Sequence, residues 1–304
     1  MTLADRVRRD ARRAQGRVRG KLVWEADRFV GRHISAFERL GRLTPIAASQ
    51  VEPRLLFDTS DREMGPHIWT DAGYEEADLA WILEHLGHPQ QGRTVVEVGG
   101  NVGTTTVPLL VRFGAQHVET FEPASGNIKL LRCNLILNDL EDRVVVHPLA
   151  VSDRNGSVTL ELCDWNTGDH RIQALDSAWE VFNESAWATT VVDARRLEEA
   201  LSANPSDVGL VWVDTQGHES HVLAGASTLL DRGIPWVIEY WPYGLTRAGG
   251  LDRLHATIAE HFSVAVDVRA SRVRGTVVRM APERIPELGA ELGTGYTDLI
   301  LLEA

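Results

Sequence analysis

Acidic and glycine residues that could hold a small charged ligand follow one another at the end of a predicted strand. Gly99, Gly100 and Gly103 would leave bare backbone N–H groups where a ligand can approach closely. Their spacing departs from the G-x-G-x-x-G of dinucleotide-binding turns. Glu97, two positions before the first glycine, would repel a pyrophosphate but could hold a cationic amino group. The turn, which also contains Asn101, therefore favours the zwitterionic end of an amino acid over a phosphate.

A second acidic strand end lies about one βα unit further along. Residues 116–121 form a predicted strand, and Glu122 follows it directly. A carboxylate at this place can accept hydrogen bonds from both hydroxyls of a ribose. Glu122 therefore predicts a nucleoside without deciding between a nicotinamide cofactor and S-adenosylmethionine, and the alternative is a solvated strand end.

Two more predicted strands end in acids. Asp214 follows the apolar run 208–213, and Glu239 lies in the run 235–241. In a doubly wound sheet both would face the same crevice, with His218 on the turn beside them. His218 could act as a general base, and the two carboxylates could ligate Mg²⁺, which would acidify a hydroxyl. The alternative is a hydrogen-bond network that holds this turn.

Residues 164–171 form a polar, aromatic loop that could cover the same sheet edge as a lid. Within it, His170 could be a general base or metal ligand, Trp165 a stacking platform and Arg171 an anion clamp. Trp241 stands in or beside another predicted loop, where its ring could pack against a sugar. The alternatives are a solvated surface loop and tryptophans that serve packing alone.

The elements that must position these residues alternate between strand and helix. Residues 125–138 are a predicted helix and 144–151 a predicted strand, and a further helix at 74–86 precedes the glycine turn. This alternation predicts a parallel sheet with helices on both faces. Two last strands, 262–268 and 296–302, close the sheet.

Four motifs together resemble the FkbM-type S-adenosylmethionine-dependent methyltransferases. They are Val96 to Gly103, Phe121-Glu122-Pro123 with Asn127, Leu131 and Asn134, His147 to Ser152, and Val213 to Glu219. The resemblance covers roughly residues 70–304, and the last motif is the family's most distinctive. Two residues depart from the pattern, since Gln216 stands where an acid is more frequent and Gly100 where alanine is usual.

The resemblance implies an α/β fold with the doubly wound, Rossmann-like sheet of class I methyltransferases, which has seven strands and ends in an antiparallel edge pair. It also implies S-adenosylmethionine as the cofactor, with the Ala150 region beside the adenine. We expect the cofactor to contact Glu97, Gly99, Asn101, Gly103, Glu122, Asn127, Ala150 and Ser152.

The chain is expected to divide at residue 74 into an N-terminal extension, 1–74, and a methyltransferase domain, 75–304. Residues 1–42 show a helical apolar stripe and carry twelve basic against five acidic residues. This basic amphipathic helix could lie on an anionic membrane surface, but packing on the acidic body or on a second subunit of a homodimer is favoured. Residues 43–74, punctuated by proline and glycine, predict an irregular cap near the site.

The chain of 304 residues has a net charge of −12, and the part after residue 42 is strongly acidic. An acidic body argues against nucleic acid as the main partner, because phosphate binding is largely electrostatic. No apolar run approaches the ~20 residues that span a bilayer, and the N-terminus lacks a signal-peptide core. The two cysteines, Cys133 and Cys163, fit a reduced, cytoplasmic protein.

These patterns favour an O-methyltransferase that moves the methyl group of S-adenosylmethionine to a sugar hydroxyl of a glycoside, oligosaccharide or glycosylated natural product. The alternatives are a polyketide or other non-sugar hydroxyl as acceptor, an NAD-type oxidoreductase, and a noncatalytic nucleoside-binding module. The glycine spacing and Glu97 argue against the oxidoreductase.

Overall fold

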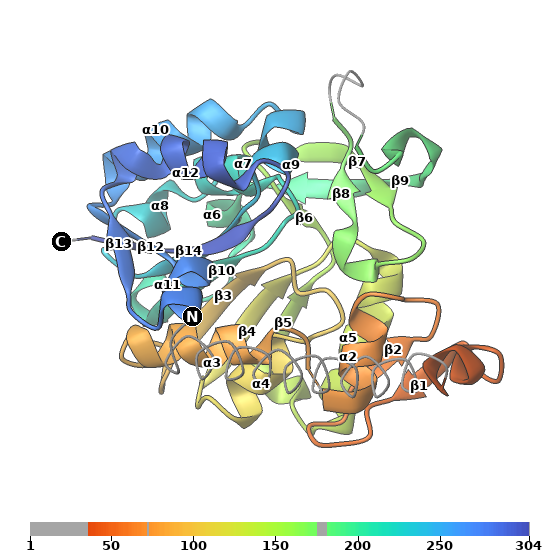
Figure 1. Cartoon of the computed structure of the whole chain (residues 1–304). Helices are drawn as coiled ribbons and strands as arrows, with labels where there is room; N and C mark the ends of the chain where they lie inside the picture. The colour runs from red at the N-terminus through yellow and green to blue at the C-terminus, as the bar shows by residue number, and fades with distance from the viewer. Residues whose placement is uncertain (1–35, 72, 175–180, 304) are drawn as a thin grey trace, which may run out of the picture.

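The computed structural model describes residues 36–71, 73–174 and 181–303, and its centre is a sheet of eight strands (Figure 1). The strands lie in the order β13-β12-β14-β11-β10-β3-β4-β5. β3, β4, β5, β10 and β11 run parallel, whereas β14 is antiparallel to both of its neighbours. The bounds are β3 Thr94–Val98, β4 His117–Phe121, β5 Val144–His147, β10 Val208–Val213, β11 Trp236–Tyr240, β12 Val264–Asp267, β13 Val278–Met280 and β14 Thr297–Leu302.

The predicted doubly wound α/β sheet of class I methyltransferase type is confirmed, but it has eight strands rather than seven. The extra strand is β13, which pairs antiparallel with β12. The short helix α11 (Val268–Arg274) and Gly275, at φ 68°, turn the chain back, and Ser271 Oγ accepts a hydrogen bond from the Val278 N–H at 2.8 Å. β12 and β14 do pair antiparallel, as expected, but β13 and not this pair forms the sheet edge.

The strands are buried on both faces, and their residues alternate between two cores. In β10, Leu210 and Trp212 pack in one core, while Val211 and Val213 pack in the other. This period of two is the signature of a parallel strand covered on both sides. The sheet therefore needs helices on each face, which explains the nearly continuous apolar runs in the sequence.

The helices cover the two faces as the alternating pattern predicts (Figure 1). On one face lie α3, α4 and α5, and on the other α7, α8, α10 and α12. The bounds of the helices not yet given are α2 Met64–Asp71, α3 Glu76–His85, α4 Thr106–Val111, α5 Ser125–Leu137, α6 Leu197–Ala200, α7 Glu219–Ala224, α8 Ser227–Leu230, α9 Pro242–Arg247, α10 Leu251–His261 and α12 Ile285–Leu292.

Two smaller sheets flank the large one. A four-stranded sheet of order β6-β9-β7-β8 follows β5, with bounds β6 Ala150–Val151, β7 Gly156–Leu162, β8 Arg171–Ile172 and β9 Ala188–Arg195. Short 3-10 helices lie in the connections, and one of them, Thr167–Asp169, follows β7. The other small sheet pairs β1 (Ile46–Ala48) with β2 (Leu56–Asp58).

The segment expected to be an irregular cap is tied closely to the methyltransferase body. Leu55, Phe57 and Ile68 belong to the same apolar core as α4 and α5. The Asn134 side chain on α5 pairs with the backbone of Leu56, accepting its N–H at 2.6 Å and donating to its carbonyl at 3.1 Å. The same amide donates to the Val102 carbonyl at 2.7 Å, so one side chain joins β2 to the glycine turn.

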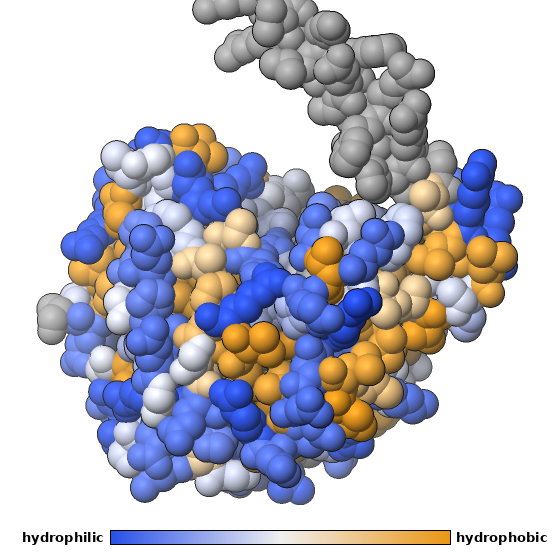
Figure 2. Space-filling view, turned by 90° about the horizontal axis from the view of Figure 1, so that it is seen from below, coloured by the Kyte–Doolittle hydropathy of each residue, from blue (hydrophilic) through white to orange (hydrophobic). Residues whose placement is uncertain are grey.

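Most of the predicted basic amphipathic helix, residues 1–35, lies outside the described residues. Residues 36–41 are helical, and Phe37 stacks on Phe57 with ring centroids 5.9 Å apart. None of the helices in the described ranges combines the length and apolar character that crossing a bilayer requires. Figure 2 shows one face of the molecule, on which polar residues prevail and apolar residues gather in small separate patches.

Candidate active site

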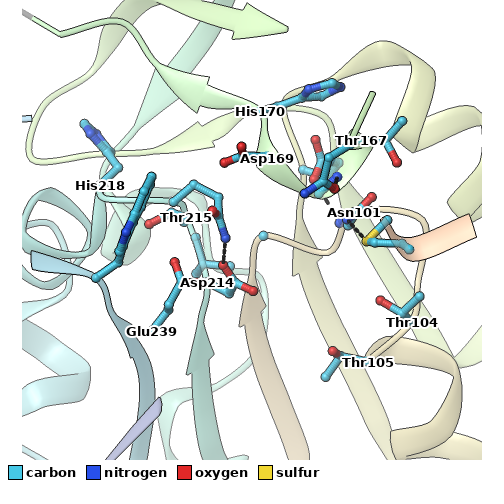
Figure 3. Close-up of a pocket in the computed structure, with 18 of the residues that line it drawn as sticks. Asn101, Thr104, Thr105, Thr167, Asp169, His170, Asp214, Thr215, His218 and Glu239 are labelled. Atoms are coloured by element: carbon cyan, nitrogen blue, oxygen red, sulfur yellow. Dashed lines mark hydrogen bonds between the residues drawn. The ribbon is translucent and has the colours of Figure 1, made fainter. Parts of the chain in front are cut away.

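A cavity of about 400 Å³ opens at the carboxyl ends of β3, β4, β10 and β11. The segment before α3, the loop 164–170 and the start of β14 complete its walls. Asn101 and Thr104 lie toward one end, and His218 and Glu239 toward the other (Figure 3). This is the edge at which ligands bind in open α/β sheets, as the sequence predicts.

The glycine turn after β3 is shaped by close backbone approach. Gly99 has φ 100°, and a Cβ atom there would stand 1.8 Å from the Asp214 carbonyl oxygen. Gly103, at φ 95°, packs against Leu131 instead of lining the cavity. Close packing also explains why Gly100 is a glycine, since a Cβ atom there would stand 2.0 Å from Thr120 Oγ1. Of the turn residues expected to contact a cofactor, Gly99 and Asn101 line the cavity.

Glu122 is held at the end of β4 by backbone donors. Its Oε2 accepts from the Asn101 N–H at 2.9 Å, and its Oε1 accepts from the Ala124 N–H at 2.7 Å. Burial raises the pKa of Glu122 to about 7. Each oxygen uses one acceptor site on the backbone and keeps another for a ligand, which is the geometry that a ribose diol needs.

Apolar and amide groups surround Glu122 in the cavity. Ala150 lines it together with Phe121 and Leu149, and these provide an apolar wall of the kind a purine base prefers. Asn127 lines it as well, and its Nδ2 donates to the Thr167 carbonyl at 3.0 Å. Asn127 therefore also holds the loop 164–170 in place.

Glu97 lies behind the glycine turn and does not line the cavity. Its side chain is 1% exposed, and its Oε2 accepts from Thr106 Oγ1 at 2.5 Å, at the start of α4. Burial raises the pKa of Glu97 to about 7. The expected direct contact with an amino group is thus replaced by a contact that fastens α4 to β3.

The His218 ring is oriented by a chain of hydrogen bonds through Ser152 to Asp153. Its Nε2 lies 3.0 Å from Ser152 Oγ, and Ser152 Oγ lies 3.4 Å from Asp153 Oδ1. If Ser152 donates to Asp153, it accepts from the Nε2–H of His218 and leaves the Nδ1 lone pair free. That nitrogen is buried without a partner. Burial, with His221 stacked at 4.1 Å, lowers the pKa of His218 to about 3, so the ring is neutral.

Ser152 therefore belongs with His218 and not with the cofactor pocket that the sequence predicts for it. It does not line the cavity, whereas His218 does. The direction of the Ser152 side chain depends on β6, which pairs with β9 in the small sheet instead of continuing β5. Pro148 stands between β5 and β6, where the sequence indicates one strand over 144–151.

Asp214 and Glu239 are brought together, as expected, at the ends of β10 and β11 (Figure 3). Asp214 Oδ1 accepts from Gln216 Nε2 at 2.8 Å, and burial raises the pKa of Asp214 to about 6. Glu239 is 7% exposed and its Oε2 has no partner. Burial and the nearby charge of Asp214 raise the pKa of Glu239 well above its usual value. Glu219 Oε1 fastens the turn by accepting from the Thr215 N–H at 2.9 Å.

The two residues expected to bind magnesium have few companions. Among the residues that the structure describes, no group of three or more His, Cys, Asp or Glu side chains is arranged to hold a metal ion. Mg²⁺ usually keeps several waters and takes one or two carboxylates from the protein. Asp214 and Glu239 alone would be such a sparse set.

The loop 164–170 covers the cavity as predicted, and Trp165, Thr167 and His170 line it. The Cys163 N–H donates to His170 Nδ1 at 3.1 Å, so the neutral ring carries its proton on Nε2. Burial lowers the pKa of His170 to about 4. Because Nδ1 already accepts from Cys163, His170 is placed to donate a hydrogen bond through Nε2 and has no free nitrogen with which to act as a base.

Arg171 does not line the cavity, so it is not placed as the anion clamp that the sequence suggests. Its side chain is 2% exposed and forms ion pairs with Asp169 and with Glu184, the latter at 2.9 Å. The guanidinium carbon also lies over the Trp241 ring, 4.7 Å from its centroid, and Trp241 lines the cavity. Arg171 thus positions Trp241 and the end of the loop.

Asp61 is the main residue that sequence patterns do not identify. Its Oδ1 accepts the N–H groups of Glu63, Met64 and Gly65, which begin α2. Its Oδ2 accepts the N–H and the hydroxyl of Thr167, both at 2.7 Å. The only sequence signal is an acid three residues before a helix, which predicts a helix cap but not a partner about a hundred residues away.

The family comparison decides what this site belongs to. The methyltransferase FkbM domain matches residues 97–258, more than half of the chain. The chain belongs to the FkbM methyltransferase family. The match spans the glycine turn, Glu122, the loop 164–170, Asp214, His218 and Glu239. The resemblance expected from the sequence is thereby confirmed.

One curated relative of this FkbM chain is the 2-O-methyltransferase NoeI of Sinorhizobium fredii (strain NBRC 101917 / NGR234). The two are 27% identical over 149 residues, which cover 45% of this chain and 59% of NoeI. The chain thus matches less than two thirds of the length of that relative.

Two solved structures resemble the FkbM chain weakly. An O-methyltransferase from Bacillus cereus in complex with SAH is 14% identical with a TM-score of 0.41, covering 89% of this chain and 90% of that one. A geranyl diphosphate C-methyltransferase from Streptomyces coelicolor A3(2), solved with Mg²⁺, geranyl diphosphate and S-adenosyl-L-homocysteine, is 13% identical with a TM-score of 0.40, covering 75% and 78%. Similarity at this level carries no argument about the reaction.

Proposed function

We propose that this FkbM methyltransferase uses S-adenosylmethionine and methylates a hydroxyl group of a sugar, in a glycoside, oligosaccharide or glycosylated natural product. The observation that carries the cofactor is the pairing of Glu122 with the Asn101 and Ala124 N–H groups beside an apolar wall. When bound, S-adenosylmethionine supplies an activated methyl group. The protein then has to orient the acceptor and take its proton.

The cofactor end of the cavity fits a nucleoside with an amino-acid tail. Glu122 would accept from the ribose hydroxyls, and Ala150 would lie against the base. Gly99 would leave its backbone open to the amino-acid end. Glu97 lies behind this turn, so it would act through α4 and not by contact.

His218 is the proposed base for the acceptor hydroxyl. The hydrogen bonds through Ser152 fix its ring and leave one nitrogen without a partner. A positioned base contributes roughly 10²–10⁴-fold to a rate, the lower end applying to a ring whose pKa is as low as that of His218, and alignment of the reacting groups contributes further. Asp214, which follows β10 on the same turn as His218, would accept a hydrogen bond from the acceptor.

The sugar assignment rests on the aromatic side chains of the cavity. Trp165 and Trp241 both line it, and indole faces pack well against the C–H faces of sugar rings. The relative NoeI is a 2-O-methyltransferase by name, which agrees with oxygen as the acceptor atom. A non-sugar hydroxyl, such as that of a polyketide, is the second candidate because much of the wall is apolar.

The test of the cofactor is calorimetric titration of S-adenosylhomocysteine into the full chain, with NAD as the control ligand. We expect micromolar binding of the first and none of the second. Glu122→Gln should weaken binding about 10- to 100-fold, because hydrogen bonds to charged groups contribute roughly 1.5–3 kcal/mol. The matched control is Glu141→Gln on the exposed surface, which should bind as the wild type does.

Binding of NAD in place of S-adenosylhomocysteine, or silence with both, would overturn the cofactor assignment. The acceptor is then tested by incubating the enzyme with methyl-labelled S-adenosylmethionine and glycoside acceptors, and by locating the methyl group in the product. Transfer to non-sugar alcohols alone would move the proposal to the second candidate.

A further inference from the structure

Four carboxylates line the part of the cavity formed by the ends of β10 and β11, the start of β14 and the segment before α3. They are Glu75, Asp214, Glu239 and Asp298. Asp214 and Glu239 come from the ends of β10 and β11, Asp298 from the start of β14 and Glu75 from the segment before α3. Figure 3 shows Asp214 and Glu239 side by side there. We call this set the acidic end.

Glu239 is the member that points to a ligand. It is 7% exposed, it lines the cavity, and its Oε2 has no hydrogen-bond partner. In the antiparallel pairing of β11 with β14, it stands directly opposite Asp298. Like charges in directly opposed positions destabilise a sheet. A buried, unpaired carboxylate facing a second one costs stability unless it takes up a proton or something cationic occupies the space between them.

The protein itself supplies little positive charge at this end. Among the described residues that line the cavity, Arg269 is the only Arg or Lys side chain, and its Nη1 donates to the Tyr296 carbonyl at 3.2 Å. Asp78, also in the lining, is paired with Arg272. His218 is neutral. The charge of the acidic end is therefore left for a proton to balance in the free protein, and for a cationic ligand in the complex.

The cofactor is too far away to be the only source of that charge. The glycine turn follows β3, whereas Glu239 and Asp298 belong to β11 and β14, two and three positions along the sheet. At about 4.8 Å per strand, these positions are roughly 10 and 14 Å away. Asp214, one position along, lies close enough to face the cofactor, whereas Asp298 does not.

Aromatic rings accompany the carboxylates. Tyr74, Trp241 and Tyr296 line the same end of the cavity, and the Tyr296 hydroxyl donates to Glu75 Oε1 at 3.1 Å. Carboxylates combined with aromatic faces form the usual surroundings of an organic cation. They also fit the apolar body of a molecule that carries one.

From these observations we propose that the acceptor carries a protonated amine, which binds between Glu239 and Asp298 while its hydroxyl faces His218. This inference rests on the proposed function and names the class of its acceptor, an amino sugar or another amine-bearing alcohol. An ammonium ion suits this end because carboxylates and aromatic rings line it together. The amine is a binding handle, and the methyl group goes to oxygen.

The first test compares paired probes. Amino glycosides, such as methyl glucosaminide and a multiply aminated glycoside, are titrated into the chain saturated with S-adenosylhomocysteine, each beside its N-acetyl derivative. We expect the amine of a pair to bind at least tenfold more tightly. Glu239→Gln should remove that difference, whereas the exposed Glu260→Gln should keep it. Equal binding within every pair, or no binding by any probe, overturns the proposal.

The second test needs no acceptor. If the carboxylates oppose each other in the free protein, Glu239→Gln should raise Tm by about 2 °C or more, since a gain near 1 kcal/mol shifts a chain of this size by that much. A purely structural Glu239 would instead lower Tm on substitution. Stabilisation by millimolar Mg²⁺, lost in Glu239→Gln and not reproduced by amines, would assign the site to a metal and overturn the amine proposal.

These outcomes are separable from those of the proposed function. Failure of S-adenosylhomocysteine to bind removes the cofactor assignment, and the paired probes can then still be compared in the free chain. Binding of the cofactor with no preference for amines removes only the present inference. A product with its methyl group on nitrogen would keep the cation site and overturn the choice of oxygen.

Discussion

At the scale of single residues, His218 is the side chain whose role the geometry makes testable. Its Nε2 is held by Ser152 and its Nδ1 has no partner. We expect His218→Asn to lower kcat by about 10²-fold, the lower end of what a positioned base contributes because the pKa of this ring is low, and to leave the affinity for S-adenosylhomocysteine unchanged. Full activity of this variant on the true acceptor would show that the base is another group.

The low pKa of His218 shapes the pH profile of that experiment. With a pKa of about 3, the ring is already neutral well below physiological pH. Any loss of activity between pH 7 and 5 should therefore persist in His218→Asn, since it would come from carboxylates. An acidic limb that is present in the wild type and vanishes in the variant would contradict this assignment.

Arg171 gives a second prediction at this scale. Its guanidinium is paired with Asp169 and Glu184 in the interior. Removing one partner of such a group leaves buried charges uncompensated, so Arg171→Gln should lower the free energy of unfolding by roughly 3–5 kcal/mol. Arg171→Lys should cost less. If Arg171 instead clamped an anionic acceptor, KM would rise with no change in Tm.

At the scale of elements, Asp61 joins α2 to the loop 164–170 through five hydrogen bonds. Asp61→Asn turns one oxygen into a donor that faces other donors. We expect a loss of roughly 2 kcal/mol in stability and weaker binding of S-adenosylhomocysteine, because the loop would no longer be fastened over the cavity. Asp142→Asn, on the exposed surface, is the matched control. Unchanged affinity in a less stable Asp61→Asn variant would restrict Asp61 to a role in folding.

The strands and their acidic ends could be predicted from sequence because local patterns determine them. β3 and β10 are short, mainly apolar runs, and an acid or glycine marks where each one ends. In a parallel sheet such ends meet at one edge, which is why the pattern predicts that Asp214 and Glu239 lie together.

What could not be predicted is the direction of individual side chains and the partners they find across the chain. Ser152 turns toward His218 because β6 leaves the large sheet. Arg171 turns inward because it forms a buried ion pair with Glu184. Asp298 and Asp61 acquire their importance from pairing with distant segments. β13 was missed because three residues after a tight turn carry too little pattern to mark a strand.

At the scale of the whole molecule, buried acids and buried histidines give opposite pH dependences to stability. Burial raises the pKa of Glu97, Glu122 and Glu219 to about 7, so their contribution is full below their unfolded pKa and is lost as pH rises through about 7. Histidines with lowered pKa act the other way, but only below about pH 6.5, where the unfolded ring begins to protonate. Above that pH the acids act alone.

The Tm of the ligand-free chain should therefore fall between pH 6.5 and 8. The acidic end contributes to this fall through Asp214, Glu239 and Asp298, whose pKa values burial raises, while Glu75, Asp78 and Arg269 face the same space. Differential scanning calorimetry across this range is the measurement. Glu239→Gln should make the slope shallower, and a Tm that rises over the same range would refute the explanation.

The joint at Asp61 also limits how such chains can be recombined. One carboxylate holds both the start of α2 and Thr167. Residues 43–71 and 164–170 therefore depend on each other structurally, despite their distance in the sequence. A chimera that takes its acceptor-facing loop from a relative must take the matching N-terminal segment with it. Exchange of either segment alone would leave Asp61 or Thr167 without its hydrogen-bond partner.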